Sequence, residues 1–164
     1  MKTTNTFAKL VSAWNKHPRM IDNEGGTRSG KTFSTLQLLS IYLPNTKKPK
    51  IYSVVSETIP HLKRGAIRDF KAIMAADNRW DENKWSKVDN IYTFANGSIL
   101  EFFSADNTGK VHGSARDGLF INECQNISWE IARQLFVRTR DRIILDYNPT
   151  HNFWIHDHIK PRKD

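Results

Sequence analysis

EGGTRSGKTFS, residues 24–34, satisfies the pattern G-x-x-x-x-G-K-[ST] at every position from Gly25 to Thr32. Glycines at these places let backbone N–H groups turn toward a phosphate, and the helix that follows adds the positive end of its dipole. In such a loop Lys31 reaches the β- and γ-phosphate oxygens, and the Thr32 hydroxyl can ligate Mg²⁺. We therefore predict a nucleotide site. Its phosphate-binding residues are Gly25, Gly26, Thr27, Arg28, Ser29, Gly30, Lys31 and Thr32.

The residues on either side of this stretch decide between a phosphate-binding loop and a chance match in a surface loop. The segment KTFSTLQLLSIYL, which starts at Lys31, is rich in helix-compatible apolar residues and stops at Pro44, as a helix should. The strand that must precede the loop, residues 19–23, has only Met20 and Ile21 as apolar residues, which is weak for a buried parallel strand. The helix favours the phosphate-binding loop, and the strand is its weakest support.

Apolar strands and amphipathic helices alternate along the rest of the chain. Helices are predicted around Phe7–Trp14, at 59–76 and at 127–138, and strands at 51–56, 118–123 and 142–149. Residues 91–105 are two apolar runs around Asn96-Gly97, which favours a hairpin with a tight type I′ turn. Residues 75–90 are predicted to be a surface loop. The alternation predicts an α/β fold, with a mostly parallel sheet flanked by helices and an antiparallel hairpin insertion.

The composition fits one ordinary domain with an anionic partner. The chain has 164 residues, 38% of them hydrophobic, enough for a single sizeable core. An excess of 25 Lys and Arg over 17 Asp and Glu gives a net charge of +8, which favours nucleic acid as a partner without requiring it. No apolar run is long enough for a signal peptide or a membrane span, so a soluble intracellular protein is expected. Cys124, the single cysteine, excludes an internal disulfide and is expected to fill core space.

GLFINECQN, residues 118–126, supplies the acidic group that a nucleotide-hydrolysing site needs. The apolar residues 119–121 are predicted to form a buried strand that ends at Asn122 and Glu123. A carboxylate in that place can polarise the attacking water. We predict this role for Glu123; the alternative is an exposed glutamate at the end of a strand. Arg28, inside the phosphate loop, is either a transition-state stabiliser or a solvated loop residue.

Five segments in order resemble one family, the ATPase motor domain of the large terminase subunit of tailed bacteriophages. They are GGTRSGKT (25–32), SETIPHLKRGAIRDF (56–70), FANGSILEFFSADN (94–107), LFINE (119–123) and RIILDYNPTHNFW (142–154). The resemblance covers about residues 19–155. Many unrelated NTPases share the first segment, so the hairpin, INE and DYNP carry the discrimination.

This resemblance implies a P-loop NTPase fold of the additional-strand (ASCE) type, with residues 1–164 as one ATPase domain and about 1–18 as an N-terminal helical segment. It implies DNA-stimulated hydrolysis of ATP with Mg²⁺, coupled to translocation of double-stranded DNA into a procapsid. The implied partners are ATP, DNA, the portal protein and the small terminase subunit, with a homo-oligomeric ring on the portal and no membrane. The implied location is the host-cell cytoplasm at the procapsid portal, not the virion or the outside of the cell.

Carried over by position, the resemblance assigns further roles. Asn148 with Pro149 would sense the γ-phosphate and couple hydrolysis to movement, although Asn-Pro is also a good turn former after a strand. Ring motors commonly complete a site with an arginine from the neighbouring subunit. Arg116 is the candidate here, with Arg138 and Arg140 behind it, and each is otherwise a surface or DNA-facing charge.

Two departures from the family pattern matter. The family usually has Asp before the catalytic glutamate, whereas this chain has Asn122, which can hold a metal-bound water but brings no charge. Thr32 and the phosphates are then expected to carry more of the Mg²⁺ binding. Large terminases also continue into a nuclease domain, and this chain ends shortly after the coupling motif, so we expect no nuclease activity from it. An excised domain and a truncated gene product both explain the length.

Two other functions stay open. One is a different additional-strand ATPase, such as a helicase core. The other is a non-catalytic nucleotide-binding scaffold, which Asn122 would suit. A metal site in HNFWIHDH, residues 151–158, is disfavoured because no second cluster completes a coordination shell. The basic residues Lys63, Arg64 and Arg68 are either a solvated face or part of a DNA-facing surface.

Overall fold

A computed structural model describes residues 4–160. The helices are α1 Asn5–Asn15, α2 Lys31–Tyr42, α3 Ile59–Arg64, α4 Ala66–Ala76, α5 Thr108–Gly113 and α6 Trp129–Val137. The strands are β1 Met20–Glu24, β2 Ile51–Ser56, β3 Trp85–Ser86, β4 Ile91–Thr93, β5 Ile99–Ser104, β6 Arg116–Ile121 and β7 Thr139–Tyr147. No helix within residues 4–160 has the length and apolar character needed to cross a bilayer.

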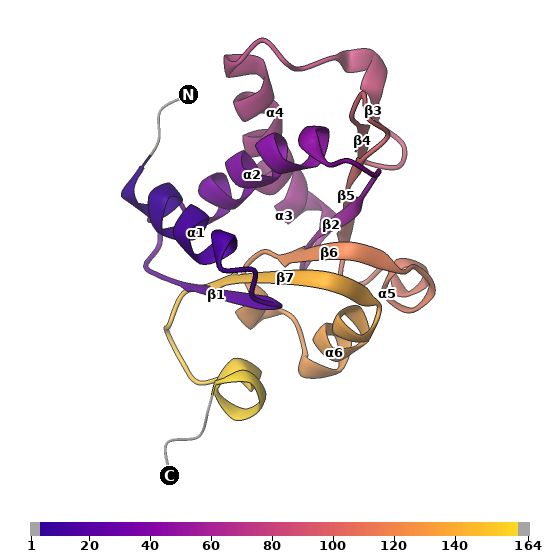
Figure 1. Cartoon of the computed structure of the whole chain (residues 1–164). Helices are drawn as coiled ribbons and strands as arrows, with labels where there is room; N and C mark the ends of the chain where they lie inside the picture. Colours follow the sequence, from indigo (N-terminus) through magenta and orange to yellow (C-terminus); the bar gives the residue numbers. More distant parts are fainter. Residues whose placement is uncertain (1–3, 161–164) are drawn as a thin grey trace.

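The strands form one sheet in the order β1-β7-β6-β2-β5-β4-β3 (Figure 1). From β1 to β5 all neighbours are parallel, and β4 and β3 are added antiparallel. This arrangement confirms the mostly parallel sheet with an antiparallel insertion. It also explains the weak apolar pattern of residues 19–23, because β1 is an edge strand with one neighbour and needs less burial than a central strand.

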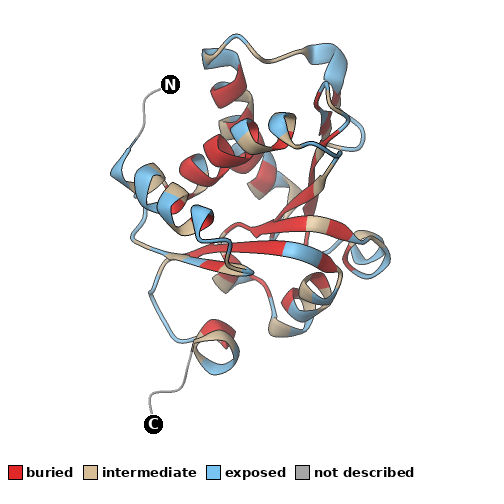
Figure 2. Cartoon of the chain, in the orientation of Figure 1, coloured by how far each residue is buried: buried red, intermediate tan, exposed pale blue. Residues whose placement is uncertain are grey.

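Helices cover both faces of the sheet (Figure 1). One face packs against α1, α2, α3 and α4, and the other packs against α5, α6 and residues 153–159. Along β6, Phe120 points to the first face while Leu119 and Ile121 point to the second, as the period of a strand requires. The central strands and α2 are buried over most of their length (Figure 2).

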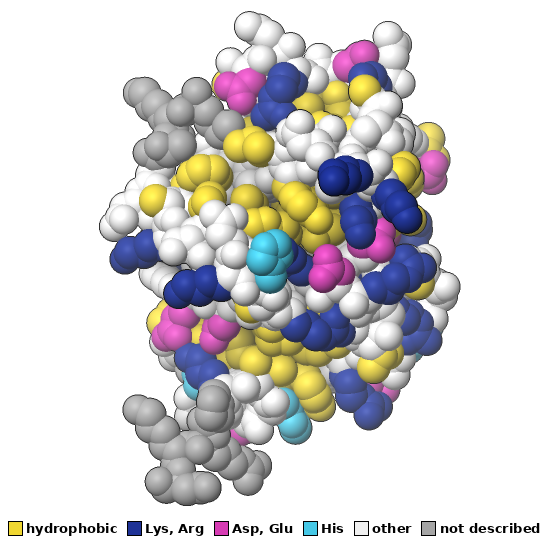
Figure 3. All heavy atoms as spheres, viewed as in Figure 1, with side chains coloured by type: hydrophobic (Ala, Val, Ile, Leu, Met, Phe, Trp, Pro, Cys, Tyr) yellow, Lys and Arg dark blue, Asp and Glu magenta, His cyan; other side chains and the backbone are white. Residues whose placement is uncertain are grey.

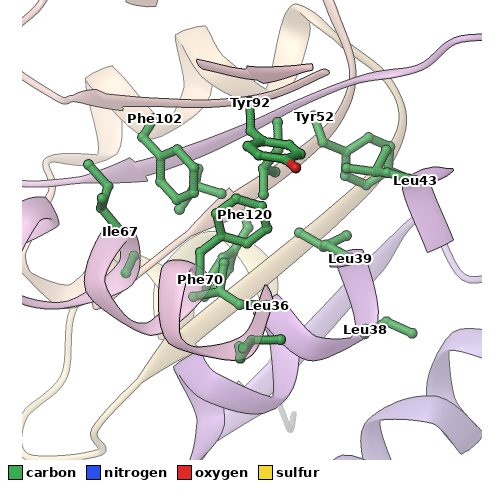
Figure 4. Packing of buried hydrophobic residues seen from close by; sticks show 14 of the residues in the cluster. Leu36, Leu38, Leu39, Leu43, Tyr52, Ile67, Phe70, Tyr92, Phe102 and Phe120 are labelled. Carbon is green, nitrogen blue, oxygen red and sulfur yellow. The ribbon is translucent and has the colours of Figure 1, made fainter. Parts of the chain in front are cut away.

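The first face has the more aromatic core. Phe70 of α4 lies edge-on to Tyr92, with ring centroids 5.5 Å apart, and tilted against Phe102, with centroids 5.6 Å apart. Figure 4 shows these rings meeting leucines of α2 such as Leu36 and Leu39. Such offset and edge-on ring pairs add to the energy of area burial. These contacts pack α2, the helix after the phosphate loop, and α4 against the sheet.

Three local predictions differ from the structure. The helix expected at 59–76 is two helices, because Gly65 adopts φ −114° and ψ −98° and interrupts it. The hairpin is present, but its turn is not type I′: only Gly97 has positive φ, at 86°, and its N–H donates to the Phe94 carbonyl. This is the geometry of a longer turn with one left-handed glycine.

The third difference is residues 75–90, predicted as a surface loop. They contain the short strand β3, and the Trp85 side chain is only 7% exposed. The ring of Trp80 packs 5.7 Å from that of Trp85, between centroids. The many charged residues of this segment favoured a surface loop, although Trp80 and Trp85 pack against the core.

Candidate functional site

The phosphate loop joins β1 to α2 at the carboxyl edge of the sheet. Gly30 takes φ 78°, a left-handed conformation that favours glycine, and α2 starts at the next residue. Arg28 also has positive φ, at 64°, and the Gly25 N–H donates to the Tyr147 carbonyl of β7 at 3.2 Å. The loop and the helix N-terminus therefore have the arrangement that the sequence pattern requires.

The Lys31 ammonium lies inside this loop. Its Nζ donates to the carbonyls of Gly25 and Gly26 at 2.7 and 2.8 Å, and to Ser29 Oγ at 3.0 Å. It also donates to Asn148 Oδ1 at 3.1 Å. Desolvation lowers the pKa of Lys31, and the carboxylates of the site oppose this change. An anion placed in the loop would restore a full counter-charge to the ammonium.

Residues 122 and 123 follow β6, as predicted. Glu123 takes the left-handed conformation, φ 52°, which turns the chain out of the strand and directs the side chain to the rim of the site. Its Oε2 lies 2.7 Å from Nε2 of His61 on α3, within ion-pair distance. Thr58 caps α3 through a hydrogen bond from the His61 N–H, 3.3 Å long, and so fixes the helix that carries the imidazole.

Asp146, near the end of β7, is the residue of this site that sequence reasoning missed. It is 1% exposed, and its carboxylate accepts from the Glu123 N–H at 2.6 Å and from Thr32 Oγ1 at 3.0 Å. Asn122 Nδ2 donates to both of its oxygens at 3.3 Å. Burial raises the pKa of Asp146 to about 6, against the lowering effect of these hydrogen bonds. The signal available in the sequence was an acidic residue at the end of an apolar strand, in DYNP.

Asn122 is a hydrogen-bond donor at the centre of the site. Its Nδ2 donates to Thr32 Oγ1 at 2.8 Å, and its Oδ1 accepts from Ser56 Oγ at 3.0 Å. The direction of the amide follows from Asp146, because an ionised carboxylate only accepts and must face the NH₂ group. In this orientation the Asn122 oxygen points to Ser56, away from Thr32, and is not directed at a metal beside Thr32. Binding of Mg²⁺ by Asn122 through a water stays a prediction.

These groups surround a hollow of about 200 Å³. Its lining includes residues 27–33 of the loop and helix, together with Asp69, Glu123, Asp146, Tyr147 and Asn148. Asn148 Nδ2 donates to Thr27 Oγ1 at 3.3 Å, so this side chain bridges the phosphate loop and β7. Pro149, just after it, is exposed, as is Arg28 at the rim.

The Thr32 hydroxyl and the Asp146 carboxylate are oxygen donors of the kind that Mg²⁺ prefers, and they lie in contact. Within residues 4–160 no group of three or more His, Cys, Asp or Glu side chains could hold a metal by itself. The donor set fits Mg²⁺ that shares its coordination with phosphates and water, as is usual for this ion at nucleotide sites.

The prediction of Arg116 as the arginine donated to a neighbouring subunit is wrong. Its side chain is fully buried, and the guanidinium donates to Ser53 Oγ at 2.9 Å and to the carbonyls of Leu135 and Ser114 at 3.1 and 3.0 Å. It is held within its own domain and cannot reach another. Arg138 and Arg140 also lie at the amino ends of the strands, on the sheet edge opposite the hollow.

Two other predictions concern side chains outside the hollow. Cys124 is fully buried, which raises the pKa of its thiol and agrees with a core position. Residues 155–159 form a π-helical turn that carries His156 and His158. His158 stacks on Trp129, with ring centroids 4.2 Å apart.

Comparison with known proteins identifies a family whose model matches most of the chain. Residues 23–154 match the model of a family described as terminase large subunit, T4likevirus-type, N-terminal. No curated protein sequence matches the chain.

Several solved structures have the same fold. The large terminase of a thermophilic bacteriophage is 19% identical with a TM-score of 0.76, over 91% of this chain and 40% of that one. The large terminase of bacteriophage HK97 is 10% identical with a TM-score of 0.71, over 90% and 33%. The ATPase domain of the large terminase of Thermus phage P74-26 is 11% identical with a TM-score of 0.63, over 99% and 73%.

A further structure of the thermophilic-phage terminase, with 18% identity and a TM-score of 0.72, contains ATP-gamma-S. The chain thus spans about 40% of the length of that terminase. The shared architecture is the fold of these terminase domains, a mostly parallel sheet with helices on both faces, as the resemblance implied.

Proposed function

Because the chain belongs to the terminase large subunit family, T4likevirus-type, N-terminal, we propose that it is an ATP-hydrolysing DNA-packaging motor domain. One observation carries this proposal: the phosphate-loop lysine, the acid that follows β6, and Asn148 all border a single hollow. The proposed reaction is the hydrolysis of Mg·ATP, coupled to movement of duplex DNA into a procapsid.

In this proposal each side chain has a distinct task. Water attacks the γ-phosphorus, the bond to the oxygen bridging the β- and γ-phosphorus atoms breaks, and Glu123 accepts the proton of the water. Lys31 exchanges its loop carbonyls for β- and γ-phosphate oxygens. Bound Mg²⁺ would neutralise phosphate charge, with Thr32 among its ligands.

His61 and Asn148 act on these groups rather than on the nucleotide alone. The 2.7 Å contact from His61 occupies Oε2 of Glu123 and fixes the carboxylate at the rim. Asn148, just after β7, accepts a hydrogen bond from Lys31 Nζ. A shift of that ammonium toward phosphate would therefore break or lengthen this hydrogen bond. We propose that this link couples the state of the nucleotide to the rest of the domain, and that Arg28 adds positive charge beside the phosphates.

The first experiment is phosphate release from Mg·ATP at high protein concentration, with and without duplex DNA. Hydrolysis that DNA stimulates is expected. Nucleotide binding without hydrolysis would instead support the non-catalytic scaffold. Unwinding of a forked duplex would favour a helicase core, which predicts strand separation where a packaging motor predicts movement along intact duplex.

The proposed partners follow from the family rather than from this chain alone. We propose that the domain works as a homo-oligomeric ring at the portal of the procapsid, in the host-cell cytoplasm, together with the small terminase subunit. Since Arg116 is buried, an arginine donated between subunits must be an exposed one, and Arg140 is available on the surface.

Duplex DNA has a suitable surface on α3 and α4, which we name the α4 groove. Basic side chains are more numerous than acidic ones on the face seen in Figure 3, which favours an anionic partner in general. The α4 groove, of about 450 Å³, is lined by Lys63, Ile67, Arg68, Lys71, Trp85 and Lys87, among others. Lys71 Nζ lies 5.0 Å from the ring centroid of Trp85. Cations around an apolar floor suit the phosphate backbone without reading sequence.

Reversing two of these charges, Lys63→Glu with Arg68→Glu, is expected to weaken DNA binding and to make it less dependent on salt. Each lost phosphate contact reduces the slope of log affinity against log salt by about 0.9. Fluorescence anisotropy of a labelled duplex over a salt series measures both effects. Lys16→Glu, an exposed charge at the end of α1, is the control. An equal loss with Lys16→Glu would assign the effect to net charge and not to the α4 groove.

A further inference from the structure

We propose that Asp146 on β7 supplies the carboxylate of the Mg²⁺ site, in place of the residue that precedes the catalytic glutamate on β6. Asn122, at that position just after β6, then serves to orient Asp146 and Thr32. The carboxylate thus comes from β7 instead of from the residue that follows the neighbouring strand, β6. This inference rests on the proposed function, because it concerns the metal that accompanies ATP.

Strand register is the first support. β6 and β7 are parallel neighbours in which Ile121 pairs with Leu145. Asn122 and Asp146 are each the next residue, so they lie side by side at the carboxyl edge of the sheet, where α2 begins. A carboxylate at either position can reach Thr32, and Asp146 does so, with Thr32 Oγ1 donating to Oδ2 at 3.0 Å.

The charge balance is the second support. Asp146 is 1% exposed, and its hydrogen bonds come from neutral donors: a backbone N–H, a hydroxyl and a side-chain amide. Among the ion pairs of residues 4–160, none includes Asp146. A buried carboxylate is costly without a counter-charge. The Lys31 charge attracts Asp146 through space, but its Nζ bonds to loop carbonyls and Asn148 rather than to Asp146. A cation beside Thr32 would be the direct partner that this carboxylate lacks.

The role of Asn122 is the third support. A carboxylate at position 122, next to Asp146, would place two like charges at contact distance in a buried site. The amide avoids this repulsion, and its NH₂ group bonds Thr32 and Asp146 together. Asn122 is therefore explained as the hydrogen-bond donor that Asp146 needs beside it, and not as a lost metal ligand.

The test exchanges the two side chains. Three variants are compared with the wild type: Asp146→Asn, Asn122→Asp, and the double variant that carries both changes. Asp141→Asn is the matched control, because Asp141 is an exposed carboxylate on the same strand but does not line the hollow. Mn²⁺, which prefers the same oxygen ligands, replaces Mg²⁺, and electron paramagnetic resonance measures the Mn²⁺ bound in the presence of ADP. Thermal unfolding shows that each variant is folded.

Asp146→Asn is expected to weaken Mn²⁺ binding by at least about 10- to 100-fold, the range of supporting-residue effects at metal sites. ADP binding in EDTA should change little. The double variant should recover most of the Mn²⁺ affinity, and Asp141→Asn should keep it. Wild-type Mn²⁺ affinity in folded Asp146→Asn, or a folded double variant without recovery, would overturn the proposal.

Failure of the proposed function has a different signature. If the wild type binds Mn²⁺ with ADP but releases no phosphate from Mg·ATP, hydrolysis is refuted and the assignment of Asp146 stands or falls on the binding data. If the wild type hydrolyses ATP while Asp146→Asn retains full Mn²⁺ affinity, only the assignment of Asp146 is refuted. A wild type that binds no Mn²⁺ with ADP refutes it as well.

Discussion

Glu123→Gln is expected to reduce phosphate release by about 10²- to 10⁴-fold while ATP stays bound, because general-base catalysis contributes a factor of that size. Glutamine keeps the shape of the side chain but cannot take a proton from water. Lys31→Ala is expected to lose nucleotide affinity as well, since its ammonium is the cation inside the loop. Binding of a fluorescent ATP analogue, beside phosphate release, separates the two effects.

Glu130→Gln, an exposed glutamate in the first turn of α6, is the matched control and should hydrolyse ATP at the wild-type rate. A second comparison uses His61→Ala, which removes the partner of Glu123 Oε2 but leaves the carboxylate. Its effect should be smaller than that of Glu123→Gln. Turnover by Glu123→Gln at the wild-type rate would show that another group activates the water, and Asp69 on the same hollow would then be the next to test.

Much of the site is local in the sequence and could be predicted from it. The pattern at residues 25–32 determines both the turn of the loop and the helix after it, because glycine conformations and the helix start involve neighbouring residues. The place of Glu123 in the site could be predicted because an apolar strand is followed there by an acidic residue. Asn148 contacts Lys31, and its role as a sensor of the γ-phosphate stays a prediction.

What could not be predicted depends on contacts between distant segments. Asp146 reaches Thr32 only through the register of β6 and β7, which no local pattern encodes. Arg116 has the sequence context of a surface charge, and its burial follows from Ser53 and Leu135, which are far from it along the chain. The weak apolar pattern of β1 is explained by its position at the edge of the sheet. That position could not be predicted, because a single sequence does not give the order of the strands.

Gly118→Ala is expected to destabilise the fold by about 3 kcal/mol or more, the upper range for overpacked cores, against a total stability of about 5–15 kcal/mol. Gly118 on β6 pairs with Tyr52 on β2, and the Tyr52 ring lies directly over it. A Cβ at Gly118 would lie 2.1 Å from Cε2 and Cζ of that ring. The ring has little room to move, because the rings of Trp14 and Tyr42 pack against it, with centroids 6.5 and 5.8 Å away.

Chemical denaturation measures this effect, and Gly113→Ala is the matched control, since a Cβ there meets no atom within 4 Å. A double-mutant cycle with Tyr52→Leu identifies the contact responsible. Tyr52→Leu alone should destabilise by leaving a cavity, but in the Gly118→Ala background it should recover part of the lost stability, because it removes the ring that the new methyl group meets. Additive losses in the cycle would contradict this account. They would mean that the glycine is required by the β6 backbone itself and not by the ring that covers it.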